Sequence, residues 1–171
     1  ESHFFGPLVV LDEPDGSLSL IDGQQRITSA VMLLCIIRDK ISSFETDSVR
    51  VGEMLIPLAS QVNALLYKPN MKATRFVPNY QIQEVFSQYI LASPGAPDRK
   101  TLRKKGGGMS ETEKRVTKEL RTSYFRMNEK LDEWLQNNSE EVHEDDQKQQ
   151  IYSLIGSLQN AFEVLTITVY T

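Results

Sequence analysis

The residues best suited to chemistry lie together at 20–28, in the sequence LIDGQQRIT. An apolar segment runs into Asp22-Gly23, and an apolar segment with helical periodicity follows at once. The first N–H groups of a helix lack intrahelical partners, and the helix dipole makes that end positive. Arg26 adds a planar fork of donors that suits phosphate. The DGQQR segment (residues 22–26) therefore predicts an anion site with a carboxylate beside it.

A purely structural interpretation of the same residues stays open. Asp22 followed three residues later by Gln25 has the spacing of a capping box, which stabilises a helix start by about 1 kcal/mol. Against this, Gln24, Gln25 and Arg26 place three long polar side chains on the first turn of an otherwise apolar helix. Burial of a helix does not require them, and this favours a ligand.

The elements that position this segment are predicted as follows. Strands at 7–11 and 17–21, joined by a turn at 12–16, form a β-hairpin, and Gly6 permits a bend into it. A central helix at 24–41 is apolar almost all round. Because Pro57 argues against a helix interior, we expect strands near 64–67 and at 73–77, with a turn at 68–70. A helix at 79–92 follows.

The second half is predicted to be mostly helical. Residues 93–109 form a basic, glycine-rich loop. Ser110 and Glu113 have capping-box spacing and begin a helix to about Asn137. A helix at 147–160 and a strand at 163–170 complete the chain. The apolar seam of the long helix comprises Val116, Leu120, Tyr124, Met127, Leu131 and Trp134. We expect an α+β fold, with a core at 1–92, the loop at 93–109 and a helical part at 110–171.

Composition excludes several classes of function. The net charge of −4 gives no global basic footprint for nucleic acid. Cys35 is the one cysteine and lies in an apolar run, which predicts a buried thiol. His3 and His143 have no partners at zinc-ligand spacing, and no Walker A motif occurs. Without a signal peptide or a membrane-length apolar run, we expect a cytoplasmic protein with no membrane partner.

The run of basic residues in the predicted loop is a second candidate site. It can contact DNA phosphates, although a solvated loop is the simpler interpretation. No aromatic residues interleave it, so base stacking is not indicated, and we expect the other Phe and Tyr residues to fill core positions. The candidate DNA contacts are Arg99, Lys100, Arg103, Lys104 and Lys105.

Residues 21–28 (IDGQQRIT) resemble the DGQQR box of a large bacterial domain family. That family, long labelled a domain of unknown function, is found at the N-terminus of GmrSD-type, modification-dependent (type IV) restriction systems. Residues 4–11 are similar to its aromatic–glycine–apolar strand, and the Tyr124-Phe125 helix and the 165–169 strand also match its order of elements. The family is similar in turn to the ParB and sulfiredoxin fold, in which a glycine–arginine box binds nucleotide phosphates.

The resemblance implies nucleotide binding, with NTP hydrolysis coupled to attack on modified foreign DNA in phage defence. Phosphate contacts would come from Gly23, Gln24, Gln25 and Arg26, with Thr28 on the same first turn. Asp22 would be the catalytic acid that positions water or, through water, a magnesium ion. Because a carboxylate repels a triphosphate unless a cation or proton intervenes, Mg²⁺ is the expected cofactor.

The sequence also departs from the family pattern. A proline–tyrosine–glutamine–arginine segment upstream, an Asn-x-x-Gly segment downstream and a His-Asn-His nuclease motif do not occur in the chain. We therefore expect a piece of a longer protein that acts with a C-terminal nuclease domain or subunit and does not cut DNA alone. Two alternatives stay open: a ParB-like, nucleotide-gated DNA-binding module without significant hydrolysis, and an inert structural unit. The nucleotide, the DNA modification and homodimerisation are also open.

Overall fold

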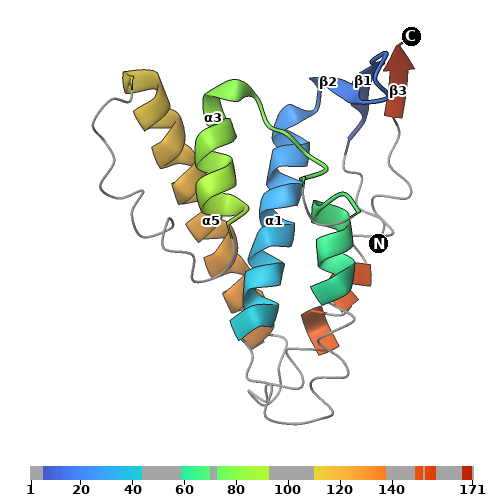
Figure 1. Cartoon of the computed structure of the whole chain (residues 1–171). Coiled ribbons are helices and arrows are strands. Elements are labelled where there is room, and N and C mark those ends of the chain that lie inside the picture. The colour runs from blue at the N-terminus through green and yellow to red at the C-terminus, as the bar shows by residue number, and fades with distance from the viewer. Residues whose placement is uncertain are drawn as a thin grey trace.

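The computed structural model describes residues 6–43, 59–69, 73–92, 110–137, 149–151, 153–156 and 167–170. Helices run along the length of the molecule, and a small sheet lies at one end of them (Figure 1). The main helices are α1 (Gln24–Ser43), α3 (Tyr80–Val85) and α5 (Glu111–Asn137). Their N-terminal ends lie at the same end of the molecule as the sheet (Figure 1). The α+β prediction is confirmed.

The sheet is built on the predicted hairpin. Strand β1 (Leu8–Asp12) pairs antiparallel with β2 (Leu18–Asp22). The turn between them closes through Gly16, whose φ is 77°, as an Asp-Gly turn requires. Strand β3 (Ile167–Tyr170) pairs parallel to β1, which gives the order β2-β1-β3 among the described strands. The closing strand is thus confirmed, and it lies beside the first strand of the chain.

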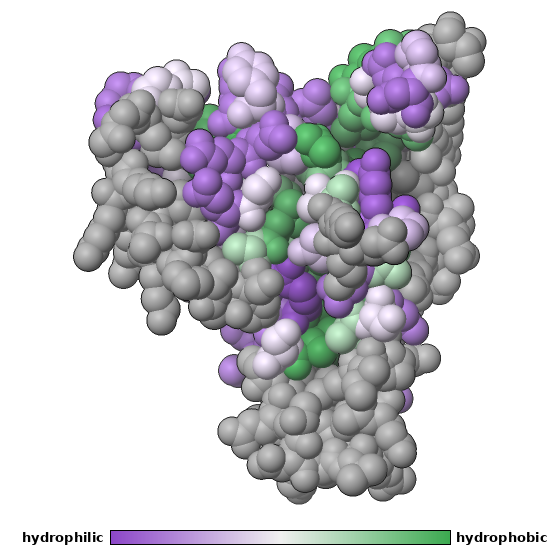
Figure 2. Space-filling model, viewed as in Figure 1, coloured by the Kyte–Doolittle hydropathy of each residue, from purple (hydrophilic) through white to green (hydrophobic). Residues whose placement is uncertain are grey.

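Strand β2 is an edge of the described sheet and is largely open to solvent. The side chains of Leu18 and Ile21 in this strand are 55% and 57% exposed. Apolar surface is visible at the sheet end of the molecule (Figure 2). The end of β2 therefore places Asp22 at a solvent-accessible edge of the sheet.

Helix α1 forms the centre of the core, as its apolar pattern predicts. Buried side chains line it from Ala30 to Ile41, and Cys35 is fully buried as expected. Helices on several sides cover it. The other fully buried side chains of the described core are Val62, Phe86, Ile90, Leu135, Ile151 and Ile155.

The prediction of strands near 64–67 and at 73–77 is wrong. Residues 59–66 are helical. Tyr67 and Thr74 form an isolated antiparallel β-bridge and not a pair of strands. Pro57 precedes these helical residues, so its missing N–H does not interrupt them. Val62 and Leu66, four residues apart, lie on the buried face of this helical segment.

The predicted helix at 79–92 is confirmed, but the sequence did not predict that part of it is a π-helix. Asn79 caps α3 by accepting a hydrogen bond from the Gln81 N–H at 3.0 Å. After Val85 the helix widens into a π-helix, η1 (Phe86–Ile90). Such π-helical turns are rare and are often found at functional sites.

The long helix α5 begins where predicted, because the Ser110 carbonyl accepts the Lys114 N–H at 3.0 Å. Tyr124 and Leu131 are buried on its seam, but Trp134 is 39% exposed and Leu135 is 1% exposed. Placing Trp134 in the seam is therefore wrong, because the 3.6-residue period carries the buried face from Leu131 to the residue four positions on.

The sequence led us to expect aromatic residues in core positions, but not all of them lie there. Phe86, Tyr89 and Tyr124 are buried, but Phe125 is 51% exposed and Tyr80 is 80% exposed. The predicted loop at 93–109 and the side chain of Glu113 lie outside the described residues. Helical residues at 149–151 and 153–156 confirm part of the predicted helix at 147–160. None of the described helices has the length and apolar character needed to cross a membrane.

Candidate nucleotide site at the start of helix α1

The DGQQR segment forms a tight switch from strand to helix. Strand β2 ends at Asp22, α1 begins at Gln24, and Gly23 between them has a φ of 96°. The first intrahelical bond of α1 runs from the Ile27 N–H to the Gly23 carbonyl, at 3.0 Å. The N–H groups of residues 24–26 thus precede the first turn's hydrogen bonds, as expected for an anion site.

The observed helix start excludes the predicted capping box. Because Gly23 occupies the N-cap position, Asp22 lies one residue before it and is out of register with Gln25. The Asp22 carboxylate instead accepts a hydrogen bond from Arg26, with 3.4 Å between Oδ2 and Nη2. The aspartate and the arginine of the segment are therefore partners across the first turn.

Arg26 also ties the helix to the chain before β1. Its Nη1 donates to the Pro7 carbonyl. Gly6, with a φ of 88°, lies so close that a Cβ there would be 3.3 Å from the Arg26 Nε. The predicted bend at Gly6 is therefore confirmed, and it makes room for the arginine. The Arg26 side chain is 35% exposed and that of Asp22 is 62% exposed, so both remain accessible.

The remaining polar residues of the first turn divide into two kinds. The Gln24 amide donates to the Leu20 carbonyl at 3.3 Å, and the Thr28 hydroxyl donates to the Gln24 carbonyl at 2.7 Å. Both groups are thus used within the fold. Gln25 is exposed and has no side-chain partner within the described part of the chain. Together with Asp22 and Arg26, it is the side chain best placed to meet a ligand.

A second polar cluster, which the sequence reasoning missed, is buried in the core. Arg38 of α1 is 7% exposed, and its guanidinium donates to the Asp39 carboxylate at 2.8 and 3.0 Å. Further bonds reach the Tyr67 hydroxyl and the carbonyls of Leu91 and Ala92, at the end of η1. The Arg38 guanidinium thus donates hydrogen bonds to carbonyl groups that follow the last turn of the π-helix.

The Arg38 cluster joins several helices. Tyr124 of α5 donates its hydroxyl to Asp39, and Lys40 pairs with Asp132 of α5 at 2.6 Å. Burial opposes the charge of Arg38, but electrostatic attraction by Cys35 and Asp39 more than offsets this and raises its pKa. The signal in the sequence is the Arg-Asp-Lys run inside an otherwise apolar helix, which a count of apolar positions ignores.

A comparison with known families decides where the chain belongs. The family described as the GmrSD restriction endonuclease N-terminal domain matches residues 1–170. The chain belongs to this family. The GmrSD N-terminal domain places the protein among type IV restriction, or phage-defence, proteins. No curated protein matches the sequence. The match confirms the resemblance carried by residues 21–28 and spans both the DGQQR segment and the Arg38 cluster.

Proposed function

We propose that this GmrSD-family domain binds a nucleoside triphosphate at the DGQQR segment and hydrolyses it during restriction of modified DNA. One observation carries the proposal. At the solvent-exposed start of α1, three backbone N–H groups without intrahelical partners lie beside the Asp22–Arg26 pair, whose charged atoms are 3.4 Å apart. A phosphate group needs donors and positive charge, and its hydrolysis needs a group that orients water.

Four residues of the segment have roles that their chemistry supports. Gly23 brings the backbone close to the phosphates, since it carries no side chain at a φ of 96°. Arg26 can turn its fork from Pro7 and Asp22 toward phosphate oxygens, and Gln25 adds an amide donor. Once Arg26 has turned, the Asp22 carboxylate is left to orient the attacking water.

Asp22 also fits a magnesium-dependent reaction. Mg²⁺ is usually held by one or two carboxylates together with waters and the phosphates of a substrate. Within the described residues, no group of three His, Cys, Asp or Glu side chains could hold a metal ion without such help. We therefore expect the ion to arrive with the nucleotide and to contact Asp22 through water, where it would neutralise phosphate charge.

The proposal includes DNA as the target of the complete protein, cut by a nuclease domain or subunit that works with this one. Contacts from this chain would come from the basic residues at 99–105, since the net charge of −4 offers no general attraction for DNA. That segment follows Ala92, whose carbonyl Arg38 holds at 2.8 Å. Helix α1 thus extends from the candidate nucleotide site to Arg38, which holds the Ala92 carbonyl.

The test is turnover by the full-length protein. Phosphate release from GTP, UTP, CTP and ATP is measured with and without Mg²⁺, for the wild type and for Asp22→Ala. We expect at least tenfold slower release in the variant, because it lacks the carboxylate that orients water. Asp12→Ala serves as the matched control, since Asp12 is also exposed and ends the neighbouring strand β1. Equal turnover in wild type and Asp22→Ala would exclude the catalytic role.

Phosphate release, measured together with nucleotide binding and thermal stability, separates hydrolysis from a nucleotide-gated switch and from an inert structural role. The alternative of a ParB-like DNA-binding module predicts that the wild type binds nucleotide tightly and releases no phosphate. An inert structural role predicts no thermal stabilisation by nucleotide, because a ligand stabilises only the state that binds it.

A further inference from the structure

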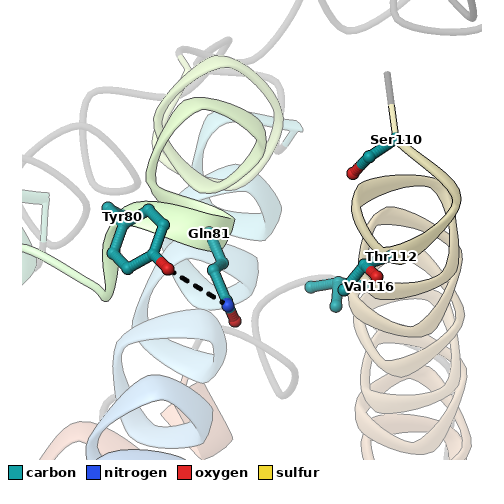
Figure 3. Close-up of a pocket in the computed structure, with 5 residues that line it drawn as sticks. All are labelled: Tyr80, Gln81, Ser110, Thr112 and Val116. Atoms are coloured by element: carbon teal, nitrogen blue, oxygen red, sulfur yellow. Dashed lines mark hydrogen bonds between the residues drawn. The ribbon is translucent and has the colours of Figure 1, made fainter.

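A pocket of about 230 Å³ lies between the first turns of α3 and α5. Tyr80 and Gln81 line it from α3, and Ser110, Thr112 and Val116 line it from the start of α5. The side chains of Ser110 and Val116 point across the pocket toward α3 (Figure 3). The pocket therefore combines an aromatic ring, an apolar wall, hydroxyl groups and a carboxamide, and none of these groups carries a charge at neutral pH.

Tyr80 is unusual among the aromatic residues of the fold. Its side chain is 80% exposed, although most described aromatic rings pack into the core. Val77, three residues earlier in the chain, is also 64% exposed. The Gln81 amide donates to the Tyr80 hydroxyl at 3.4 Å (Figure 3), which leaves the face of the ring uncovered by that contact. An exposed ring beside a pocket is suited to stacking with a flat ligand.

The lining selects the chemistry of that ligand. A phosphate or carboxylate is disfavoured, since no lining residue is cationic and Lys114, in the first turns of α5, pairs with Glu111 at 2.7 Å. A purely aliphatic ligand would leave the hydroxyl and amide groups unpaired. A flat heterocycle with donors and acceptors on its edge satisfies both the ring and the polar groups.

We propose that this pocket binds a nucleobase, stacked on Tyr80 and hydrogen-bonded at its edge by Gln81 and Thr112. The proposal rests on the proposed function, which brings both DNA and a nucleoside triphosphate to the protein. Enzymes that inspect single bases take them out of the stack and hold them between aromatic side chains and polar groups. The base can belong to DNA or to the free nucleotide, and the chemistry of recognition is the same.

The test uses the full-length protein and a DNA duplex with one unpaired 2-aminopurine, whose fluorescence changes when the base leaves the stack of the duplex. We expect this change on binding to the wild type and to Tyr80→Phe, which keeps the ring. Binding by Tyr80→Ala should be about tenfold weaker, as expected for the loss of one base–aromatic stack. A parallel titration with GTP and ATP shows whether the base comes from DNA or from the nucleotide.

The outcomes separate this inference from the proposed function. Weaker binding of either the duplex or the triphosphate by Tyr80→Ala supports the pocket and identifies the source of the base. Unchanged binding of both by Tyr80→Ala overturns it, whatever the rate of phosphate release. Asp22→Ala should lose phosphate release and retain the Tyr80-dependent fluorescence change. A failure at the DGQQR segment is therefore distinguishable from a failure at the pocket.

Discussion

Replacing Arg38 by methionine is expected to lower the free energy of unfolding by about 3–5 kcal/mol. The substitution would leave the Asp39 carboxylate, 14% exposed, without its guanidinium partner. It would also remove donors from the carbonyls of Leu91 and Ala92 at the end of η1. Uncompensated buried charge and unpaired carbonyl groups both carry a desolvation penalty, so the costs act in the same direction.

Urea denaturation of the wild type and the Arg38 variants measures this effect. Arg126→Met is the matched control, since Arg126 is exposed on α5 and should change stability by less than about 0.5 kcal/mol. Arg38→Lys should fall between them, because an ammonium keeps the charge but cannot reproduce the fork of donors. If Arg38→Met and Arg126→Met unfold at the same urea concentration, the Arg38 cluster does not stabilise the fold.

The substitution Gly23→Ala is expected to cost about 2–3 kcal/mol. An added Cβ would lie 2.3 Å from the Leu8 Cδ2, and the backbone φ of 96° is one that alanine rarely adopts. Leu8 is 4% exposed in β1, so its side chain cannot move away without disturbing the core. Backbone strain and overpacking therefore add at this position.

Two controls divide these contributions in thermal or chemical unfolding. Gly16→Ala has a similar φ of 77° with nothing within 4 Å of the added Cβ, so it should show the cost of backbone strain alone. In a double-mutant cycle, Gly23→Ala should cost about 1 kcal/mol less when Leu8 is already alanine. Equal effects of Gly16→Ala and Gly23→Ala would show that the close approach to Leu8 does not matter.

The parts of the fold that depend on neighbouring residues could be predicted from the sequence. The Asp-Gly turn specified the hairpin, and apolar periodicity specified α1 and most of α5. The open first turn at Gln24 followed from the same local pattern. These features need only short-range information, because turn chemistry and helical period are properties of consecutive residues.

The parts that depend on distant residues could not be predicted. The bond from Arg26 to the Pro7 carbonyl arises because the segment before β1 returns to the start of α1. The parallel pairing of β3 with β1 and the burial of Arg38 against η1 join residues far apart in the chain. A helix at 59–66 competes with a strand in a short apolar run, and tertiary packing decides between them.

The central claim is that a triphosphate binds at the start of α1, and equilibrium binding tests it most directly. The Kd of a non-hydrolysable GTP analogue with Mg²⁺ is measured for full-length wild type, Arg26→Gln and Arg75→Gln. Arg75 is the matched control, because it is an exposed arginine that donates to a backbone carbonyl, that of Ala64 at 2.8 Å. We expect Arg26→Gln to bind at least tenfold more weakly and Arg75→Gln to bind within about twofold of wild type. Equal Kd values for Arg26→Gln and wild type would contradict the claim.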